Sequence, residues 1–77
     1  MTRTFEPGAT LGILGGGQLG RMLALVARRL GYAVQVFTPE RHSPAGQVAD
    51  VCHVANYEDV EAVARFARQV NVVTLEP

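Results

Sequence analysis

LGILGGGQLG, at residues 11–20, joins a short apolar run to a glycine-rich turn. The apolar run predicts a buried β-strand, and Gln18 opens a segment with helical periodicity. The turn between them fits the pattern G-x-G-x-x-G through Gly15, Gly17 and Gly20. In this context the glycines let the chain reverse, bring backbone close to a ligand and pack helix against strand. We therefore expect the free N–H groups at the helix start to face an anion or a polar group; a tight turn without a ligand is the alternative.

Residues 18–30 carry the pattern of an amphipathic helix. Apolar side chains recur at i, i+3, i+4, i+7 and i+11, on one face of a 3.6-residue period. These side chains are Leu19, Met22, Leu23, Val26 and Leu30. Arg28 and Arg29 fall in the last turn, where cations complement the helix dipole, and Gly31 is a typical stop. The pattern predicts that this large apolar face packs against the core.

The rest of the chain alternates between strands and helices. Residues 1–10 are expected to be an extended lead-in, with Phe5 at the domain edge. Further strands are predicted over residues 32–37, 52–55 and 72–75. Ser43 and Pro44 open a predicted short helix that ends at about Ala49, and Asn56 is the expected cap of a helix over residues 57–70. The expected core stripe of that last helix is Val60, Val63, Ala67 and Val70, with Phe66 beside them.

This order predicts an α/β fold with a Rossmann-like parallel sheet. Right-handed crossovers place helices on both faces, and the usual half of a doubly wound fold gives the strand order 3-2-1-4. Residues 1–77 are expected to form one domain. The chain ends at VVTLEP as a strand reaches its carboxyl end, where open parallel sheets bind ligands. We expect this domain to be a fragment of a longer protein.

Composition limits the classes of function. Seven basic and seven acidic residues cancel, which gives no electrostatic basis for binding nucleic acid or an anionic membrane. No apolar run approaches the roughly 18 residues that span a bilayer. The single cysteine, Cys52, excludes an internal disulfide and is expected to be a small core side chain. A single cysteine suits a reducing compartment, so together with the lack of a long apolar run it indicates a soluble, cytoplasmic protein. His42 and His53 are not at metal-ligand spacing, so we expect no metal site in this chain.

A dinucleotide is the usual ligand of such a glycine turn, but one part of that pattern is missing. Dinucleotide-binding domains carry an Asp or Glu at the end of the second strand, where it binds the ribose hydroxyls. This chain has Thr38 and Pro39 there, and Glu40 follows the proline. Thr38 could still bond a ribose or lie near a 2′-phosphate. An NAD(P)- or FAD-binding Rossmann domain of an oxidoreductase therefore stays as an alternative.

Several segments together resemble a known family. The segments ILGGGQLGRML, ARRLGY, SPAGQVAD, NYEDVEAVARFA and VVTLE are similar to the N-terminal, pre-ATP-grasp domain of N5-carboxyaminoimidazole ribonucleotide synthetases. These enzymes are the ATPase subunits of phosphoribosylaminoimidazole carboxylase, in the ATP-grasp superfamily. A related alternative is formate-dependent glycinamide ribonucleotide transformylase, whose loop has Glu at the position of Gln18. Gln18, Arg21 and Asp50 favour the synthetase.

The resemblance implies an ATP-dependent ligase of de novo purine biosynthesis. ATP and bicarbonate would give carboxyphosphate, and its carboxyl group would pass to the amino group of 5-aminoimidazole ribonucleotide. ATP and Mg²⁺ would be bound by domains that these 77 residues do not include, so this chain alone is expected to be inactive. The resemblance also implies a homodimer of the full-length enzyme.

The resemblance assigns substrate binding to the glycine-rich loop and to the end of the last strand. Gln18 and Leu19 would hold the ribonucleotide at the helix N-terminus, and Glu76 matches the first Glu of the family's Y-E-F-E-N segment. Glu76 can accept a hydrogen bond from an amino or hydroxyl group, and Gln18 can both donate and accept. The expected substrate-binding residues are Gly16, Gly17, Gln18, Leu19 and Glu76.

Overall fold

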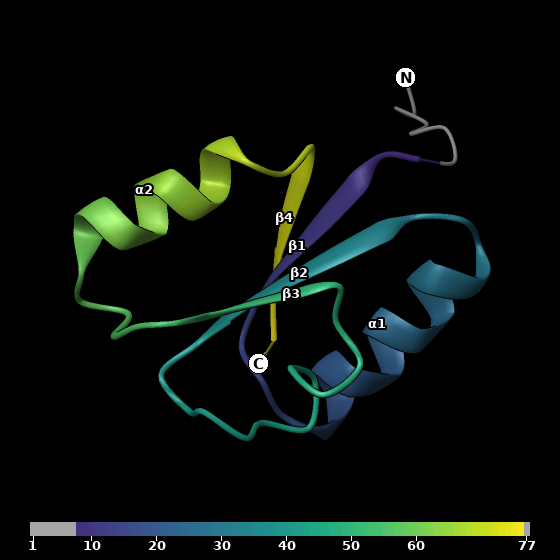
Figure 1. Cartoon of the computed structure of the whole chain (residues 1–77), viewed down its shortest axis with the longest axis horizontal. Helices are drawn as coiled ribbons and strands as arrows, with labels where there is room; N and C mark the ends of the chain where they lie inside the picture. The colour runs from purple at the N-terminus through teal and green to yellow at the C-terminus, as the bar shows by residue number, and fades with distance from the viewer. Residues whose placement is uncertain (1–7, 77) are drawn as a thin grey trace.

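A computed structural model describes residues 8–76 and shows one parallel sheet between two helices. Its elements are β1 (Thr10–Leu14), α1 (Gln18–Arg29), β2 (Ala33–Thr38), β3 (Val51–Val54), α2 (Val60–Arg68) and β4 (Val72–Leu75). The strands pair in parallel in the order β3-β2-β1-β4. Helices α1 and α2 cover opposite faces of the sheet (Figure 1). The predicted α/β class, strand order and placement of helices are confirmed, whereas the expected position of Phe5 lies outside the described residues.

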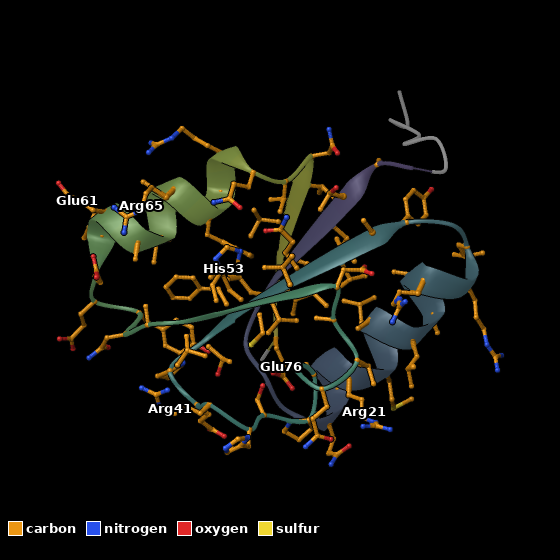
Figure 2. All side chains as sticks on the ribbon, in the orientation of Figure 1. Arg21, Arg41, His53, Glu61, Arg65 and Glu76 are labelled. Atoms are coloured by element: carbon orange, nitrogen blue, oxygen red, sulfur yellow. The ribbon has the colours of Figure 1, made fainter. Side chains whose placement is uncertain are left out.

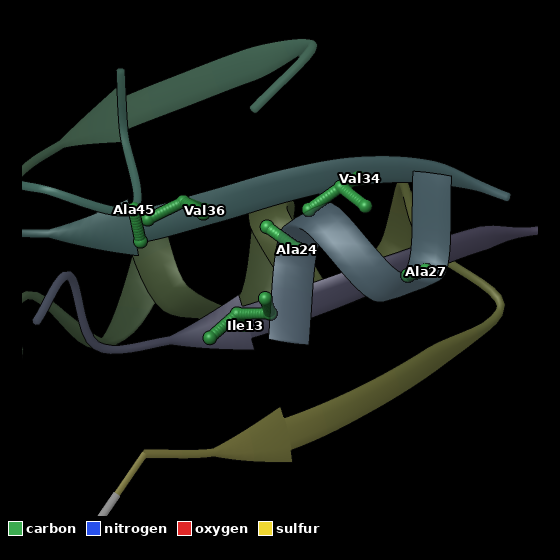
Figure 3. Packing of buried hydrophobic residues seen from close by; sticks show 6 residues of the cluster. All are labelled: Ile13, Ala24, Ala27, Val34, Val36 and Ala45. Carbon is green, nitrogen blue, oxygen red and sulfur yellow. The ribbon is translucent and has the colours of Figure 1, made fainter. Parts of the chain in front are cut away.

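The main core fills the space between α1 and the sheet. Ile13 of β1 and Val34 and Val36 of β2 point to this face because side chains alternate along a strand. They pack against three alanines, two of them from α1 (Figure 3). The three are Ala24, Ala27 and Ala45.

The side of α1 that faces the sheet differs from the prediction. Gly20, Ala24 and Ala27 are the buried residues of the helix. The large apolar residues predicted to face the core are exposed, as Met22 at 63% and Leu30 at 62% illustrate. A stripe of glycine and alanine lets the helix axis come close to the strands, which bulky side chains would prevent. The predicted helix is therefore confirmed, whereas its predicted packing face is wrong.

The opposite face of the sheet packs against α2 through aromatic rings. Phe66 is 1% exposed, and its ring centroid lies 5.4 Å from that of Phe37 on β2. A Cβ on Gly12 of β1 would lie 2.9 Å from the Phe66 ring, so this helix also needs a glycine beneath it. Val60 is predicted to lie in the core stripe, but it is 77% exposed, so that prediction is wrong. The burial of α2 depends mainly on Phe66.

The predicted start of the last helix is also corrected. Helix α2 begins later than expected and its cap is Asp59, whose carboxylate accepts a hydrogen bond from the Ala62 amide at 3.1 Å. Asn56, the predicted cap, instead accepts from the Glu58 amide at 3.3 Å in the preceding turn. Each side chain thus forms a local turn, and only the second turn continues as a helix.

The predicted short helix over residues 43–49 is absent, and the segment forms consecutive turns. The buried hydroxyl of Ser43 accepts from the Gly46 amide at 3.0 Å, which closes the first turn. Gly46 disfavours a helix interior, and the segment is too short to repay helix nucleation. The segment nevertheless packs on the sheet, because Ala45 is fully buried in the main core.

Asp50 joins this segment to the sheet. Its Oδ2 accepts from the Val34 amide at 2.7 Å, and its own amide donates to the Val34 carbonyl at 2.9 Å. Arg28, at the end of α1, donates to the Val48 carbonyl at 3.0 Å and lies 3.6 Å from Asp50 Oδ1. The end of α1 and the start of β3 are therefore held together.

Candidate functional site

The predicted site residues gather where β1 and β4 reach their carboxyl ends. Glu76 follows β4, and its amide donates to the Leu14 carbonyl at 2.9 Å, which continues the pairing of β4 with β1. Its side chain lies in the lower half of the molecule in Figure 2, beside the start of α1. The structure thus brings Glu76 next to the glycine-rich loop, although 56 positions separate it from Gly20.

The carboxylate of Glu76 binds the N-terminus of α1. Its Oε2 accepts from the Gly17 amide at 2.7 Å and its Oε1 accepts from the Gly20 amide at 3.1 Å. Gly17 is the N-cap and has no side chain to cap the helix, and the first turn contains no acidic residue. Glu76 therefore supplies both the missing cap and the negative charge that the helix dipole favours at this end. The anion expected at the helix start is a side chain of the same chain.

The three glycines of the G-x-G-x-x-G pattern all lie against this carboxyl side chain. A Cβ on Gly15 would lie 2.6 Å from Glu76 Cβ, and a Cβ on Gly17 would lie 2.5 Å from Oε1. A Cβ on Gly20 would lie 3.3 Å from Oε2. Gly15 also has φ +127°, a conformation that L-residues rarely adopt. The close approach predicted for a ligand is thus made by Glu76.

Gly16 lies on the other side of the loop and is buried. A Cβ there would lie 2.6 Å from Ser43 Cβ and 2.9 Å from Thr38 Oγ1, and the Gly16 carbonyl accepts from the Ala45 amide at 2.9 Å. Thr38 is 2% exposed, and its hydroxyl accepts from the Glu40 amide at 3.3 Å. Thr38 therefore packs beneath the loop and does not face a ribose from the surface. Contact between Gly16 and a substrate stays a prediction.

Gln18 and Leu19 are exposed at the start of α1. Within residues 8–76 their amides have no hydrogen-bond acceptor, because the two carboxylate bonds go to the amides on either side of them. Leu19 and Glu76 also border a small recess of about 50 Å³. The loop therefore offers amide donors and a carboxylate acceptor side by side.

A larger hollow of about 370 Å³ opens beside Glu76 on the α2 side of the sheet. Its lining residues are Leu14, Tyr57, Val63, Leu75 and Glu76. Tyr57 and Val63 were not predicted as site residues, because the sequence presents them only as part of a helix. An apolar groove of about 260 Å³ lies between α1 and the amino-terminal ends of β1 and β4. That groove has no clustered polar groups, so the candidate site is at the carboxyl ends of the strands.

His53 and Cys52 contact other side chains of the fold, whereas His42 is exposed. His53 Nε2 lies 2.7 Å from Gln35 Oε1, and its ring meets Phe66 edge to face. Burial raises the pKa of the Cys52 thiol, and a hydrogen bond with Ser43 opposes that rise. Residues 8–76 contain no group of three or more His, Cys, Asp or Glu side chains that could hold a metal ion. Over the same residues, neither helix has the length and apolarity required to cross a membrane.

Comparisons with known proteins point to one family. The profile of the ribonucleotide synthetase preATP-grasp domain matches residues 8–77. The N5-carboxyaminoimidazole ribonucleotide synthase of Bacillus subtilis (strain 168) is 50% identical over 70 residues, which are 91% of this chain and 18% of that protein. A crystal structure of an N5-carboxyaminoimidazole ribonucleotide synthetase with ADP matches with a TM-score of 0.95 and 51% identity, over 100% of this chain and 20% of that one.

Two further structures are relevant to the predicted substrate and to the alternative transformylase function. An N5-carboxyaminoimidazole synthase from Aspergillus clavatus, in complex with ADP and 5-aminoimidazole ribonucleotide, matches with a TM-score of 0.78 and 41% identity over 90% of this chain and 19% of that one. A glycinamide-RNase-transformylase T from Mycobacterium tuberculosis also has a TM-score of 0.78, at 27% identity over 88% of this chain and 20% of that one. The chain thus spans only 18–20% of the length of the relatives and structures named here.

Proposed function

Because the chain belongs to the ribonucleotide synthetase preATP-grasp domain family, we propose that it is the substrate-binding N-terminal domain of an ATP-dependent ligase. The full-length enzyme would carboxylate 5-aminoimidazole ribonucleotide with bicarbonate in de novo purine biosynthesis. The observation that carries this proposal is the loop at the start of α1, with open amides at Gln18 and Leu19 beside the Glu76 carboxylate. The Aspergillus clavatus relative, whose structure contains that ribonucleotide, supports the choice of substrate.

In this proposal the residues of the chain bind and orient the ribonucleotide. The amides of Gln18 and Leu19 donate to acceptor groups of the substrate, and the Gln18 side chain can both donate and accept. Glu76 uses one lone pair of each oxygen for α1, and the remaining lone pairs can accept from an amino or hydroxyl group. Gly16 lets the loop pack on Ser43 and Thr38, and Gly17 leaves room for the Glu76 carboxylate, so both glycines would act on the substrate by shaping the loop. Holding the reactants in place in this way lowers the entropic part of the barrier.

The other components would come from the rest of the enzyme. The proposal places ATP and Mg²⁺ in further domains of the longer protein, consistent with the ADP found in two relatives. ATP and bicarbonate would supply the activated carboxyl group there. The 77 residues would then be inactive by themselves, and the full-length enzyme would be a cytoplasmic homodimer that binds neither nucleic acid nor membrane.

The two alternative functions have less support. The buried Thr38 at the end of β2 offers no carboxylate to a ribose, which argues against an NAD(P)- or FAD-binding oxidoreductase domain. The transformylase relative has 27% identity, against 51% for the synthetase structure. The residues therefore favour the synthetase function over both alternatives.

Steady-state kinetics of the full-length enzyme test this proposal. Phosphate release from ATP should require both bicarbonate and 5-aminoimidazole ribonucleotide, and Gln18→Ala should raise the KM for the ribonucleotide about tenfold, which is about 1.4 kcal/mol of lost binding. The KM for ATP should stay unchanged. Gln69→Ala, a matched change of an exposed glutamine at the end of α2, should leave both constants unaltered. Turnover without the ribonucleotide, or by the 77 residues alone, would contradict the proposal.

A further inference from the structure

We propose that the Glu76 carboxylate occupies the anion-binding position of the glycine-rich loop and thereby makes the loop reject phosphate and pyrophosphate. In dinucleotide-binding domains the amides at the helix N-terminus bind the pyrophosphate of the ligand. In this chain the amides of Gly17 and Gly20 already donate to the two oxygens of Glu76, at 2.7 and 3.1 Å. The inference concerns the selectivity of the loop, and it does not depend on which substrate the full-length enzyme uses.

The space above the loop is filled by the Glu76 side chain. A single Cβ at Gly17 would lie 2.5 Å from Oε1, and one at Gly15 would lie 2.6 Å from Glu76 Cβ. A carbon atom does not fit at either distance, and a phosphate group is much larger. A ligand phosphate could reach these amides only if Glu76 left.

Glu76 is held by its backbone as well as by its carboxylate. Its amide donates to the Leu14 carbonyl at 2.9 Å, directly after the paired residues of β1 and β4. The backbone of Glu76 is therefore anchored beside the loop, so its side chain starts next to the helix amides that bind the carboxylate. Two hydrogen bonds at 2.7 and 3.1 Å then hold the carboxylate in the site.

Charge gives a second reason for the rejection of phosphate. The first turn of α1 contains no acidic residue, so Glu76 is the group that balances the positive end of the helix dipole. An anion at the open amides of Gln18 and Leu19 would lie next to this carboxylate and be repelled by it. A neutral group that accepts from these amides and donates to Glu76 meets no such repulsion.

The anionic part of a ligand at this edge would then need other partners. In Figure 2, Arg41 and Arg21 lie on either side of Glu76 in the lower half of the molecule. Arginine guanidinium groups bind phosphate oxygens in a forked geometry. The loop would therefore select the uncharged part of a phosphorylated ligand, and the phosphate would lie away from the helix N-terminus.

Removal of the carboxylate should turn the loop into an anion site. We expect Glu76→Ala to lower the thermal unfolding midpoint of the full chain. In this variant, sodium formate or phosphate at about 100 mM should raise the midpoint by about 5 °C, compared with sodium chloride at equal ionic strength. Wild type and Glu76→Gln should show no such difference between formate or phosphate and chloride, because a side chain of full length still fills the space. The carboxamide of the Glu76→Gln variant has a single acceptor oxygen and cannot accept from both helix amides in the same way, so hydrogen exchange at Gly17 or Gly20 should become about tenfold faster in that variant.

Three results would contradict the inference. Glu76→Ala that folds but does not respond to formate or phosphate would show that the loop has no affinity for anions. Glu76→Ala that stays unfolded in formate while Glu76→Gln folds would show that an anion cannot replace the side chain. Inorganic pyrophosphate that shifts the Gly17 and Gly20 amide resonances of the wild-type chain would show that Glu76 does not exclude phosphate.

Discussion

At the scale of single residues, Gly17 and Glu76 should depend on each other for their contribution to stability. A methyl group at Gly17 would displace the Glu76 carboxylate, whose Oε1 lies 2.5 Å from the position of that Cβ. We expect Gly17→Ala to lower the free energy of unfolding by about 2 kcal/mol, the upper range for loss of a helix cap. In a Glu76→Ala background the same change should cost only about 0.5 kcal/mol, because no carboxylate remains to be displaced. Urea denaturation of the four proteins measures this coupling, and additive effects would contradict the contact.

Cys52 should make the stability of the chain decrease at alkaline pH. Burial raises the pKa of its thiol in the folded state, with the Ser43 hydrogen bond acting in the opposite direction. As the pH rises past the usual thiol pKa of about 8.5, the unfolded chain loses the proton first and is favoured. The stabilising contribution is thus complete below that pH and is lost as the pH rises through the folded pKa.

Urea denaturation between pH 7 and pH 10 tests this dependence. The free energy of unfolding should fall more steeply with pH in wild type than in Cys52→Ala, which has no thiol to ionise. Equal slopes in the two proteins would mean that the folded state does not perturb the thiol.

Much of the site could be predicted at the residue scale, but its main contact could not. The glycine spacing indicated a close approach at the start of α1, and the family resemblance indicated Glu76. That these two features meet depends on the pairing of β4 with β1, which brings residue 76 beside residue 17. A glycine pattern shows that something must come close, and it does not show whether that group belongs to a ligand or to the chain.

At the scale of elements, the cap of α2 distinguishes the predicted from the observed helix start. Asp59→Ala should lower the free energy of unfolding by about 1 kcal/mol, because the Ala62 amide loses its acceptor. Asn56→Ala should stay within about 0.5 kcal/mol, since its side chain bonds only the exposed Glu58 amide. Thermal denaturation compares the two variants, and a larger cost for Asn56→Ala would restore the predicted cap.

The packing face of α1 gives a second prediction at this scale. Ala24 is fully buried against the sheet, so Ala24→Leu should overfill the core and cost about 1–3 kcal/mol. Met22 is 63% exposed, and Met22→Ala should change the free energy of unfolding by no more than about 0.5 kcal/mol. Chemical denaturation decides between the faces, and the opposite ranking would place the large apolar stripe in the core.

The wrong packing face predicted for α1 shows that helical periodicity alone does not identify which side of a helix is buried. The helix carries a large apolar stripe next to a stripe of Gly20, Ala24 and Ala27, and both have helical spacing. Periodicity identifies both stripes, but the distance between helix and sheet selects the small one. Phe66 was likewise placed beside the predicted stripe of α2, although its ring fills the space above Gly12. Which side chain fits depends on the partner surface, which is formed by distant residues.

At the scale of the whole molecule, the strand order could be predicted because few arrangements are allowed. Short connections and right-handed crossovers leave the order 3-2-1-4 as the usual result for this succession of elements, and the sheet has it. The turns at residues 43–49 replace a helix without changing that order, because Ala45 still covers the same face. The strand order can therefore be predicted even when the structure of one connection is predicted wrongly. The contacts of the site cannot, because they depend on the exact positions of single residues.

Calorimetric titration of the full-length protein with 5-aminoimidazole ribonucleotide and with NAD⁺ tests the central claim most directly. We predict that the ribonucleotide binds, that Gln18→Ala weakens its binding about tenfold, and that NAD⁺ does not bind because Glu76 occupies the helix N-terminus. Binding of NAD⁺ without binding of the ribonucleotide would contradict the account and would identify the loop as a dinucleotide site.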